Sequence, residues 1–240
     1  GRQGDKNYAG ATPSWVIWQV LQRYTREGDR VVDPMCGSGT TIDVARDLKR
    51  DVRGFDLNPT RDDITLSDAR ALPLDDAACD FVFVDPPYST HIDYSDDDRC
   101  IGKLDSGGDD GGKAYYDAMG RVIGEIHRVL RPNRYMALYV SDSYKKNNSP
   151  GARFMPIGFE LFSMMRQRFE PVDIIAVVRK NQKLARGGWR KAAEEQNFFL
   201  RGFNYLFIMK KEEDDAPIRK KARARKKMDS KKATTRKKNR

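Results

Sequence analysis

Short apolar runs and longer stretches of helical periodicity alternate along the first 210 residues of the chain. Strands are predicted at 29–33, 52–56, 64–66, 81–84, 135–140, 172–178 and 203–209. Helices are predicted at 15–24, from residue 40, at 115–130 with Pro132 as the stop, and at 157–168. The unbroken apolar run 81–84 is typical of a strand in the middle of a parallel sheet. This alternation predicts an α/β fold with a doubly wound, mostly parallel sheet.

The first helix and the last two strands carry more specific expectations. The first helix is predicted to be buried through its apolar residues Trp15, Val16, Trp18, Val20 and Leu21. No helix is predicted between the last two strands. We therefore expect these strands to form an antiparallel hairpin with a long loop.

Charge is distributed unevenly along the chain. The 240 residues carry a net charge of +10. Residues 217–240 hold 13 Lys and Arg against one Asp, which is a net charge of +12 and leaves −2 for the rest. Since the segment from residue 216 on has almost no large apolar side chain, it cannot bury a core. We predict one folded domain over 1–215 and a disordered basic tail over 216–240.

Several kinds of site and location are disfavoured. Cys36, Cys79 and Cys100 form no Cys-x-x-Cys pair and the chain has two histidines, so we expect no metal site. No apolar run approaches the ~20 residues that a membrane helix needs, and the start of the chain has no apolar signal region. We expect a cytoplasmic protein without a membrane partner, associated with the nucleoid if it is bacterial.

A glycine-rich motif follows the first predicted strand. It runs Asp-Pro-Met-Cys-Gly-Ser-Gly-Thr-Thr over residues 33–41 and leads into a helix. Ligands of open α/β sheets bind at such strand ends, and glycine lets the backbone approach a ligand closely. No Lys follows the last Gly, which disfavours a loop that binds nucleotide phosphates. A plain strand-to-helix turn is the alternative for this motif taken alone.

The second motif is Asp85-Pro86-Pro87-Tyr88, which ends the fourth predicted strand. Taken alone, it is equally typical of a proline-stiffened loop with a packed Tyr. Chemistry offers another interpretation, because an exocyclic amine is a poor nucleophile while its lone pair is delocalised into the ring. A rigidly held carboxylate and backbone carbonyl can accept both N–H bonds and localise that lone pair. The adjacent aromatic ring can stack on a flipped base.

Together the two motifs resemble those of the DNA amino-methyltransferase family, over about residues 10–211. The family patterns are Asp-Pro-Phe-x-Gly-Ser-Gly-Thr-Thr and Asp/Asn/Ser-Pro-Pro-Tyr/Phe, so Met35 departs from the usual Phe. The resemblance implies S-adenosylmethionine as cofactor and double-stranded DNA, with the target base flipped out, as substrate. It also implies methyl transfer to an exocyclic amino group.

The same resemblance implies the site residues. Those expected to bind the cofactor are Asp33, Pro34, Met35, Cys36, Gly37, Gly39, Thr40, Asp56, Leu57, Asp68 and Ala69. Those expected to carry catalysis are Asp85, Pro86, Pro87 and Tyr88. Asp56 also ends the second predicted strand, near the ~20-residue spacing at which an acid binds a ribose in nucleotide folds. A helix N-cap is the alternative for Asp68.

Two insertions, 89–112 and 179–202, are long enough to recognise a DNA target. The second has seven Lys and Arg against two Glu, which suits phosphate contacts, although a solvated hairpin loop is the alternative. Its predicted DNA contacts are Lys183, Arg186, Trp189, Arg190 and Lys191. The first insertion has seven Asp residues beside a site that must admit a polyanion. The sequence does not explain this negative charge. His91 and Asp93 are candidates for orienting the base, with neutral loop positions as the alternative.

Other functions remain open at this stage. Asp85 favours adenine N6 over cytosine N4, because Asp is the commoner first residue of the motif in adenine enzymes of the family. An RNA or tRNA base methyltransferase is the second candidate, and a non-catalytic DNA-binding architectural protein is the third. The Arg201–Tyr205 run is more similar to the DNA enzymes. Membership of a restriction-modification system, and monomer against homodimer, are left open.

Overall fold

A computed structural model of the chain describes most of the predicted domain. It covers residues 3–5, 8, 10–88, 90, 92, 94–144, 154–178, 187–195 and 197–213. The predicted tail 216–240 and the predicted boundary at residue 215 lie outside these residues, so both stay predictions.

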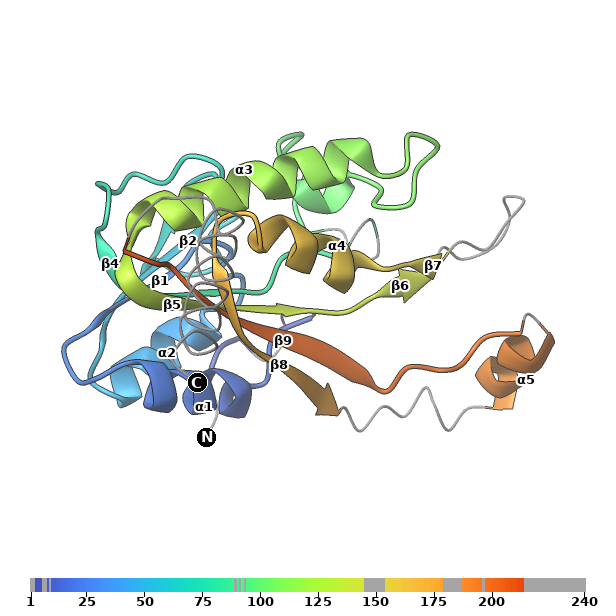
Figure 1. Cartoon of the computed structure of the whole chain (residues 1–240), viewed down its shortest axis with the longest axis horizontal. Coiled ribbons are helices and arrows are strands. Elements are labelled where there is room, and N and C mark those ends of the chain that lie inside the picture. The colour runs from blue at the N-terminus through green and yellow to red at the C-terminus, as the bar shows by residue number, and fades with distance from the viewer. Residues whose placement is uncertain are drawn as a thin grey trace, which may run out of the picture.

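A seven-stranded sheet organises the described residues, in the order β3-β2-β1-β4-β5-β9-β8 (Figure 1). Its strands are β1 Arg30–Asp33, β2 Asp51–Asp56, β3 Ile64–Leu66, β4 Cys79–Val84, β5 Leu130–Val140, β8 Glu170–Val178 and β9 Phe203–Lys210. β3, β2, β1, β4 and β5 run parallel, whereas β9 is antiparallel to both of its neighbours. The predicted fold class is confirmed.

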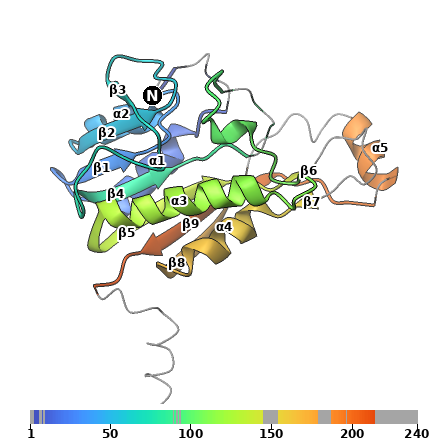
Figure 2. The ribbon, with the colours of Figure 1, turned by 90° about the horizontal axis from the view of Figure 1, so that it is seen from above.

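Helices cover both faces of the sheet (Figures 1 and 2). They are α1 Ser14–Tyr24, α2 Thr40–Asp47, α3 Lys113–Val129 and α4 Ile157–Met165, while α5 Gly187–Glu195 lies away from the sheet. α1 and α2 pack on one face with the apolar side chains of β1, β4 and β5, and α3 and α4 pack on the other. β4 is buried along its whole length, as expected for a central strand covered on both sides. Short elements at the carboxyl end of the sheet complete the fold: η1 Ile101–Lys103, β6 Ser143–Tyr144 and β7 Phe154–Met155.

Three local predictions need correction. Trp15 and Trp18 are 56% and 43% exposed, because the buried face of α1 is formed by Val16, Ile17, Val20 and Leu21. The β8–β9 hairpin is antiparallel as predicted, but its insertion contains α5, which was not predicted. This helix is short and begins at two glycines, so its helix-forming Lys, Ala and Glu residues make too little periodic pattern to be recognised. α3 ends at Val129, and Pro132 lies within β5.

The junction between β2 and the glycine-rich loop is tightly packed. A Cβ on Gly54 would lie 2.6 Å from Cys36 Sγ and 2.7 Å from Ile42 Cδ1. We expect Gly54→Ala to lower the free energy of unfolding by about 1–3 kcal/mol, because overpacking forces neighbours off their rotamers. Urea unfolding measures this change.

The matched control for Gly54→Ala is Gly124→Ala in α3. A Cβ there would meet nothing closer than 3.9 Å, in ordinary contact with Arg168. Alanine also favours a helix over glycine by about 1 kcal/mol, so the control should gain stability. Equal stability of Gly54→Ala and the wild type would show that the junction is not as tight as described.

Candidate active site

The turn after β1 is built around a buried carboxylate. Asp33 is 3% exposed. Its Oδ2 accepts a hydrogen bond from the Thr41 hydroxyl at 2.5 Å, and its Oδ1 accepts one from the Met35 N–H at 3.0 Å. These bonds close the loop from β1 into α2. Burial raises the pKa of Asp33 to about 7.

This raised pKa predicts a pH dependence of stability. Because folding favours protonated Asp33, its contribution is complete below its ordinary pKa of 3.8 and is lost as the pH rises through about 7. Asn can keep both contacts, with its oxygen toward Met35 and its NH2 toward Thr41. We expect the wild type to lose free energy of unfolding relative to Asp33→Asn between pH 5 and pH 8, in urea titrations without cofactor. An equal difference at both pH values would contradict the raised pKa.

The two glycines of the loop adopt left-handed backbone conformations, with φ of +47° at Gly37 and +77° at Gly39. The Gly37 N–H donates to Asp56 Oδ2 at 2.9 Å, which joins the loop to the end of β2. A Cβ on Gly37 would lie 2.8 Å from the Tyr8 ring, and one on Gly39 would collide with the Arg61 guanidinium. The space beside each glycine therefore holds a side chain of this protein.

A pocket opens beside this loop at the carboxyl ends of β1, β2 and β4. Eight of the predicted site residues line it: Pro34, Met35, Asp56, Leu57, Asp68, Ala69, Asp85 and Pro87. Sequence reasoning missed the others: Tyr8, Ser67, Tyr94, Cys100 and Ile101. The rest of the predicted residues, Asp33, Cys36, Gly37, Gly39, Thr40, Pro86 and Tyr88, do not line it. Their roles in binding or catalysis stay predictions.

Asp56 and Asp68, two of the carboxylates that line this pocket, can accept hydrogen bonds from a nucleoside. The Asp56 oxygens accept hydrogen bonds from the backbone N–H groups of Asn58 and Gly37, both at 2.9 Å, and also from that of Leu57. A carboxylate has about four acceptor positions, so Asp56 retains capacity for a ribose hydroxyl. Burial raises its pKa above the ordinary value. Met35 and Leu57 also line the pocket and offer apolar surface to a base, so the chemistry of the lining suits an adenosine group.

The Asp68 carboxylate is bound by Arg70 and does not cap a helix. Its oxygens accept hydrogen bonds from the Arg70 backbone N–H and guanidinium, and Arg70 Nη2 lies 2.7 Å from Asp68 Oδ2. Partial burial acts to raise the pKa of Asp68, but the bonds from Arg70 hold it below its ordinary value. No helix begins at Asp68, so the N-cap alternative is wrong.

The second motif places Asp85 between two hydroxyl donors. The Thr12 hydroxyl donates to Asp85 Oδ2, and the Tyr88 hydroxyl donates to Asp85 Oδ1 at 2.5 Å. Burial and then the Asp85 carboxylate raise the pKa of Tyr88 well above its ordinary value, so the phenol stays protonated. The buried Tyr115 hydroxyl of α3 donates to the Pro87 carbonyl at 2.8 Å. Asp85 is thus fixed from the N-terminal segment and from its own loop.

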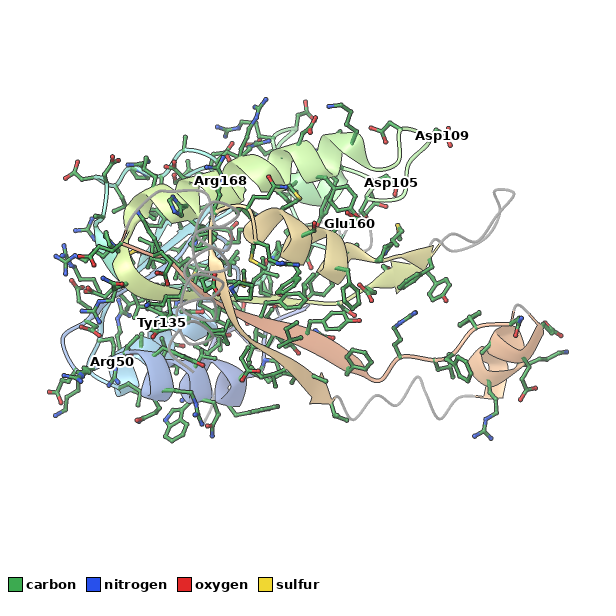
Figure 3. All side chains as sticks on the ribbon, in the orientation of Figure 1. Arg50, Asp105, Asp109, Tyr135, Glu160 and Arg168 are labelled. Carbon is green, nitrogen blue, oxygen red and sulfur yellow. The ribbon has the colours of Figure 1, made fainter. Side chains whose placement is uncertain are left out.

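The acidic insertion 89–112 forms one wall of the pocket. Tyr94, Cys100 and Ile101 face the pocket from this insertion. Two of its Asp residues pair within it, Asp97 with Arg99 at 2.6 Å and Asp98 with Lys103 at 3.4 Å. Figure 3 shows Asp105 and Asp109 on the loop that leads into α3. Part of the negative charge is therefore neutralised locally. His91 and Asp93 lie outside the described residues.

α5, which belongs to the basic insertion 179–202, lies away from the sheet (Figures 1 and 2). Lys183 and Arg186 lie outside the described residues, and the side chain of Trp189 is not described. Arg190 and Lys191 are exposed on α5. All five stay predicted DNA contacts.

Nearer to the sheet, an aromatic and basic cluster was missed by sequence reasoning. It consists of Tyr144 and Phe154 on the β6–β7 hairpin and Phe198 and Arg201 at the end of the basic insertion. Arg201 lies 4.0 Å above the Phe154 ring, and Tyr144 packs on Phe198 with ring centroids 4.7 Å apart. These residues are far apart in the sequence, and no local pattern indicates that they meet.

Two absences apply to the part of the chain that the structure describes. It contains no cluster of three or more His, Cys, Asp and Glu side chains able to hold a metal ion. None of its helices is long and apolar enough to span a membrane.

Solved structures with a similar fold include proteins whose names indicate different functions. The [4+2]-cyclase SpnF is 17% identical with a TM-score of 0.53, over 88% of this chain and 87% of that chain. TrmN from Thermus thermophilus is also 17% identical with a TM-score of 0.53, over 85% of this chain and 50% of that chain. At this identity the similarity shows the fold alone.

A third solved structure is a proposed DNA modification methylase from Thermus thermophilus, complexed with S-adenosyl-L-methionine. It is 17% identical, with a TM-score of 0.44, over 62% of this chain and 52% of that chain. The chain thus spans about half the length of two of these three proteins. No curated protein matches it.

The family model described as DNA methylase, N6_N4_Mtase, matches residues 1–66 and 79–240. This match spans nearly the whole chain, including both motifs, and leaves out residues 67–78, which contribute Ser67, Asp68 and Ala69 to the pocket. It confirms the resemblance seen in the sequence and the expected cofactor. The chain belongs to the N6/N4 DNA methylase family of S-adenosylmethionine-dependent methyltransferases.

Proposed function

We propose that this protein methylates the N6 amino group of adenine in double-stranded DNA, with the target base flipped out of the helix. The observation that carries the proposal is the position of Asp85. Its carboxylate lines the same pocket as Asp56 and Asp68, and two protein hydroxyls hold its oxygens. A base amine at Asp85 would lie beside the cofactor pocket.

Asp85 can act on the amine without leaving its own hydrogen bonds. Thr12 and Tyr88 each donate to one of its two oxygens, and a carboxylate oxygen can accept more than one hydrogen bond. In the proposed reaction an Asp85 oxygen accepts an N–H of the target amine, which localises the nitrogen lone pair. When bound, S-adenosylmethionine supplies an electrophilic methyl group. An Asp85 oxygen is also placed to take the proton that the nitrogen sheds afterwards.

The aromatic and basic cluster supports a nucleic-acid substrate. Arg201 and the rings of Tyr144 and Phe154 combine a cation with flat apolar surface, which suits phosphates and unstacked bases. Phe199, 92% exposed, adds a further ring on the same insertion. We propose that the strand carrying the target base crosses this cluster, with residues 179–202 following the DNA backbone beyond it.

Methyl transfer to defined nucleic acids tests the proposal. The protein is incubated with methyl-labelled S-adenosylmethionine and either duplex DNA or tRNA, and the product is digested to nucleosides and identified by mass. We expect N6-methyladenine in DNA. N4-methylcytosine would overturn the choice of base, and label confined to tRNA would overturn the choice of nucleic acid. DNA binding without transfer would favour the architectural alternative.

A further inference from the structure

Asn204 is a buried amide whose oxygen meets no hydrogen-bond partner in the part of the chain that the structure describes. It lies in β9, where it is 2% exposed. Its Nδ2 donates to the Tyr88 hydroxyl at 3.5 Å, and its Oδ1 has no hydrogen-bond partner among the residues that the structure describes. A buried polar atom left without a partner costs stability.

The position of Asn204 in the sheet makes this cost avoidable. Side chains alternate along a strand, so Asn204 shares a face of β9 with Leu206 and Ile208, both buried and apolar. An apolar residue at position 204 would continue this pattern and leave no unpaired amide. Stability therefore does not explain the Asn, which points to a role in the adjacent site.

The adjacent site is the carboxylate of Asp85. β9 is antiparallel to β5, so the first residues of β9 lie beside the carboxyl end of β5, at the edge where the pocket opens. The Asn204 amide reaches Tyr88 there, and the Tyr88 hydroxyl donates to Asp85. Because the Tyr88 hydroxyl has one proton, a donor on its oxygen directs that proton toward the carboxylate.

We propose that Asn204 is a positioning residue for methyl transfer: its amide orients the Tyr88 hydroxyl, which in turn orients Asp85 toward the target amine. This inference rests on the proposed function of Asp85. The 3.5 Å bond is long, as catalytic hydrogen bonds often are before substrate binds, and it shortens when the amine engages Asp85.

The test combines Asn204→Leu, which keeps the branched shape, with Tyr88→Phe, which removes only the hydroxyl. We expect Asn204→Leu to lower kcat about tenfold, with cofactor affinity unchanged and the thermal midpoint equal or higher. In the Tyr88→Phe background the same substitution should have no further effect on kcat, since the group that Asn204 orients is absent.

Ser141→Ala is the matched control. Ser141 is also a buried polar residue, immediately after β5, and its hydroxyl donates to the Asp142 carbonyl rather than to Tyr88. The effect of Ser141→Ala on kcat should be the same in the wild type and in the Tyr88→Phe background. Asn204→Ala, which adds no atoms, replaces Asn204→Leu in the cycle if the larger side chain does not fit.

Three results would overturn the proposal. They are a wild-type kcat for Asn204→Leu, losses in kcat that add independently in the double variant, or unfolding of both Asn204 variants. The coupling between Asn204 and the Tyr88 hydroxyl is also measured by urea unfolding of the same four proteins, which requires no activity. A wild-type protein that transfers no methyl group would instead count against the proposed function.

Discussion

Asp85→Ala is expected to lower kcat for methyl transfer by about 10²–10³-fold or more, the loss seen when an oriented polar group is removed from a reacting centre. The substitution removes the carboxylate that accepts the amine N–H and leaves the hydroxyls of Thr12 and Tyr88 without their acceptor. Cofactor affinity should change little, since Asp56 and Asp68 lie on other strand ends. Labelled methyl transfer and calorimetric cofactor titration measure the two effects separately.

The control for this loss of activity is Asp98→Ala in the neighbouring insertion. The Asp98 side chain is fully exposed, and its partner Lys103 is 3.4 Å away on the surface, so its removal should leave kcat near the wild-type value. Asp85→Ala protein that folds, binds cofactor and turns over at the wild-type rate would remove Asp85 from the catalytic role. Equal losses from both variants would indicate a general effect of negative charge on DNA binding.

Removal of residues 216–240 is expected to weaken DNA binding strongly and to flatten its salt dependence. The tail residues 217–240 carry a net charge of +12 and the rest of the chain −2. Each phosphate that the tail neutralises contributes about −0.9 to the slope of log affinity against log salt. With six or more such contacts, the full chain should lose at least about 10³-fold in affinity between 50 and 200 mM salt. The truncated chain should lose far less.

Phosphate contacts position a protein without specifying sequence. The truncated chain should therefore methylate the same sites, at the same rate when DNA is saturating. Titrations of both proteins at two salt concentrations distinguish the possible roles. Unchanged affinity would make the tail a solubilising segment. Tighter binding after truncation at low salt would indicate that the tail covers the acidic insertion until DNA displaces it.

The sequence alone determined the fold class, the order of the two motifs and most of the pocket lining. Asp56 ends a strand that the apolar pattern predicts, Asp68 and Asp85 follow two others, and parallel strands end at the same edge of the sheet. Their meeting in one pocket therefore follows from local periodicity and strand direction. The family match adds the cofactor and the reaction class.

Only the tertiary structure decided what holds Asp85 in place. Thr12 reaches it across 73 residues of sequence, and Asn204 lies 116 residues from Tyr88. Tyr8 and Arg61 reach the loop glycines Gly37 and Gly39 from other segments of the chain, and Arg201 reaches the rings of Tyr144 and Phe154 in the same way. A hydrogen bond between remote segments leaves no periodic or compositional trace in either one, because local pattern reports only the burial and conformation of its own element. The sheet brings these segments together, and their contacts follow from its strand order rather than from any motif.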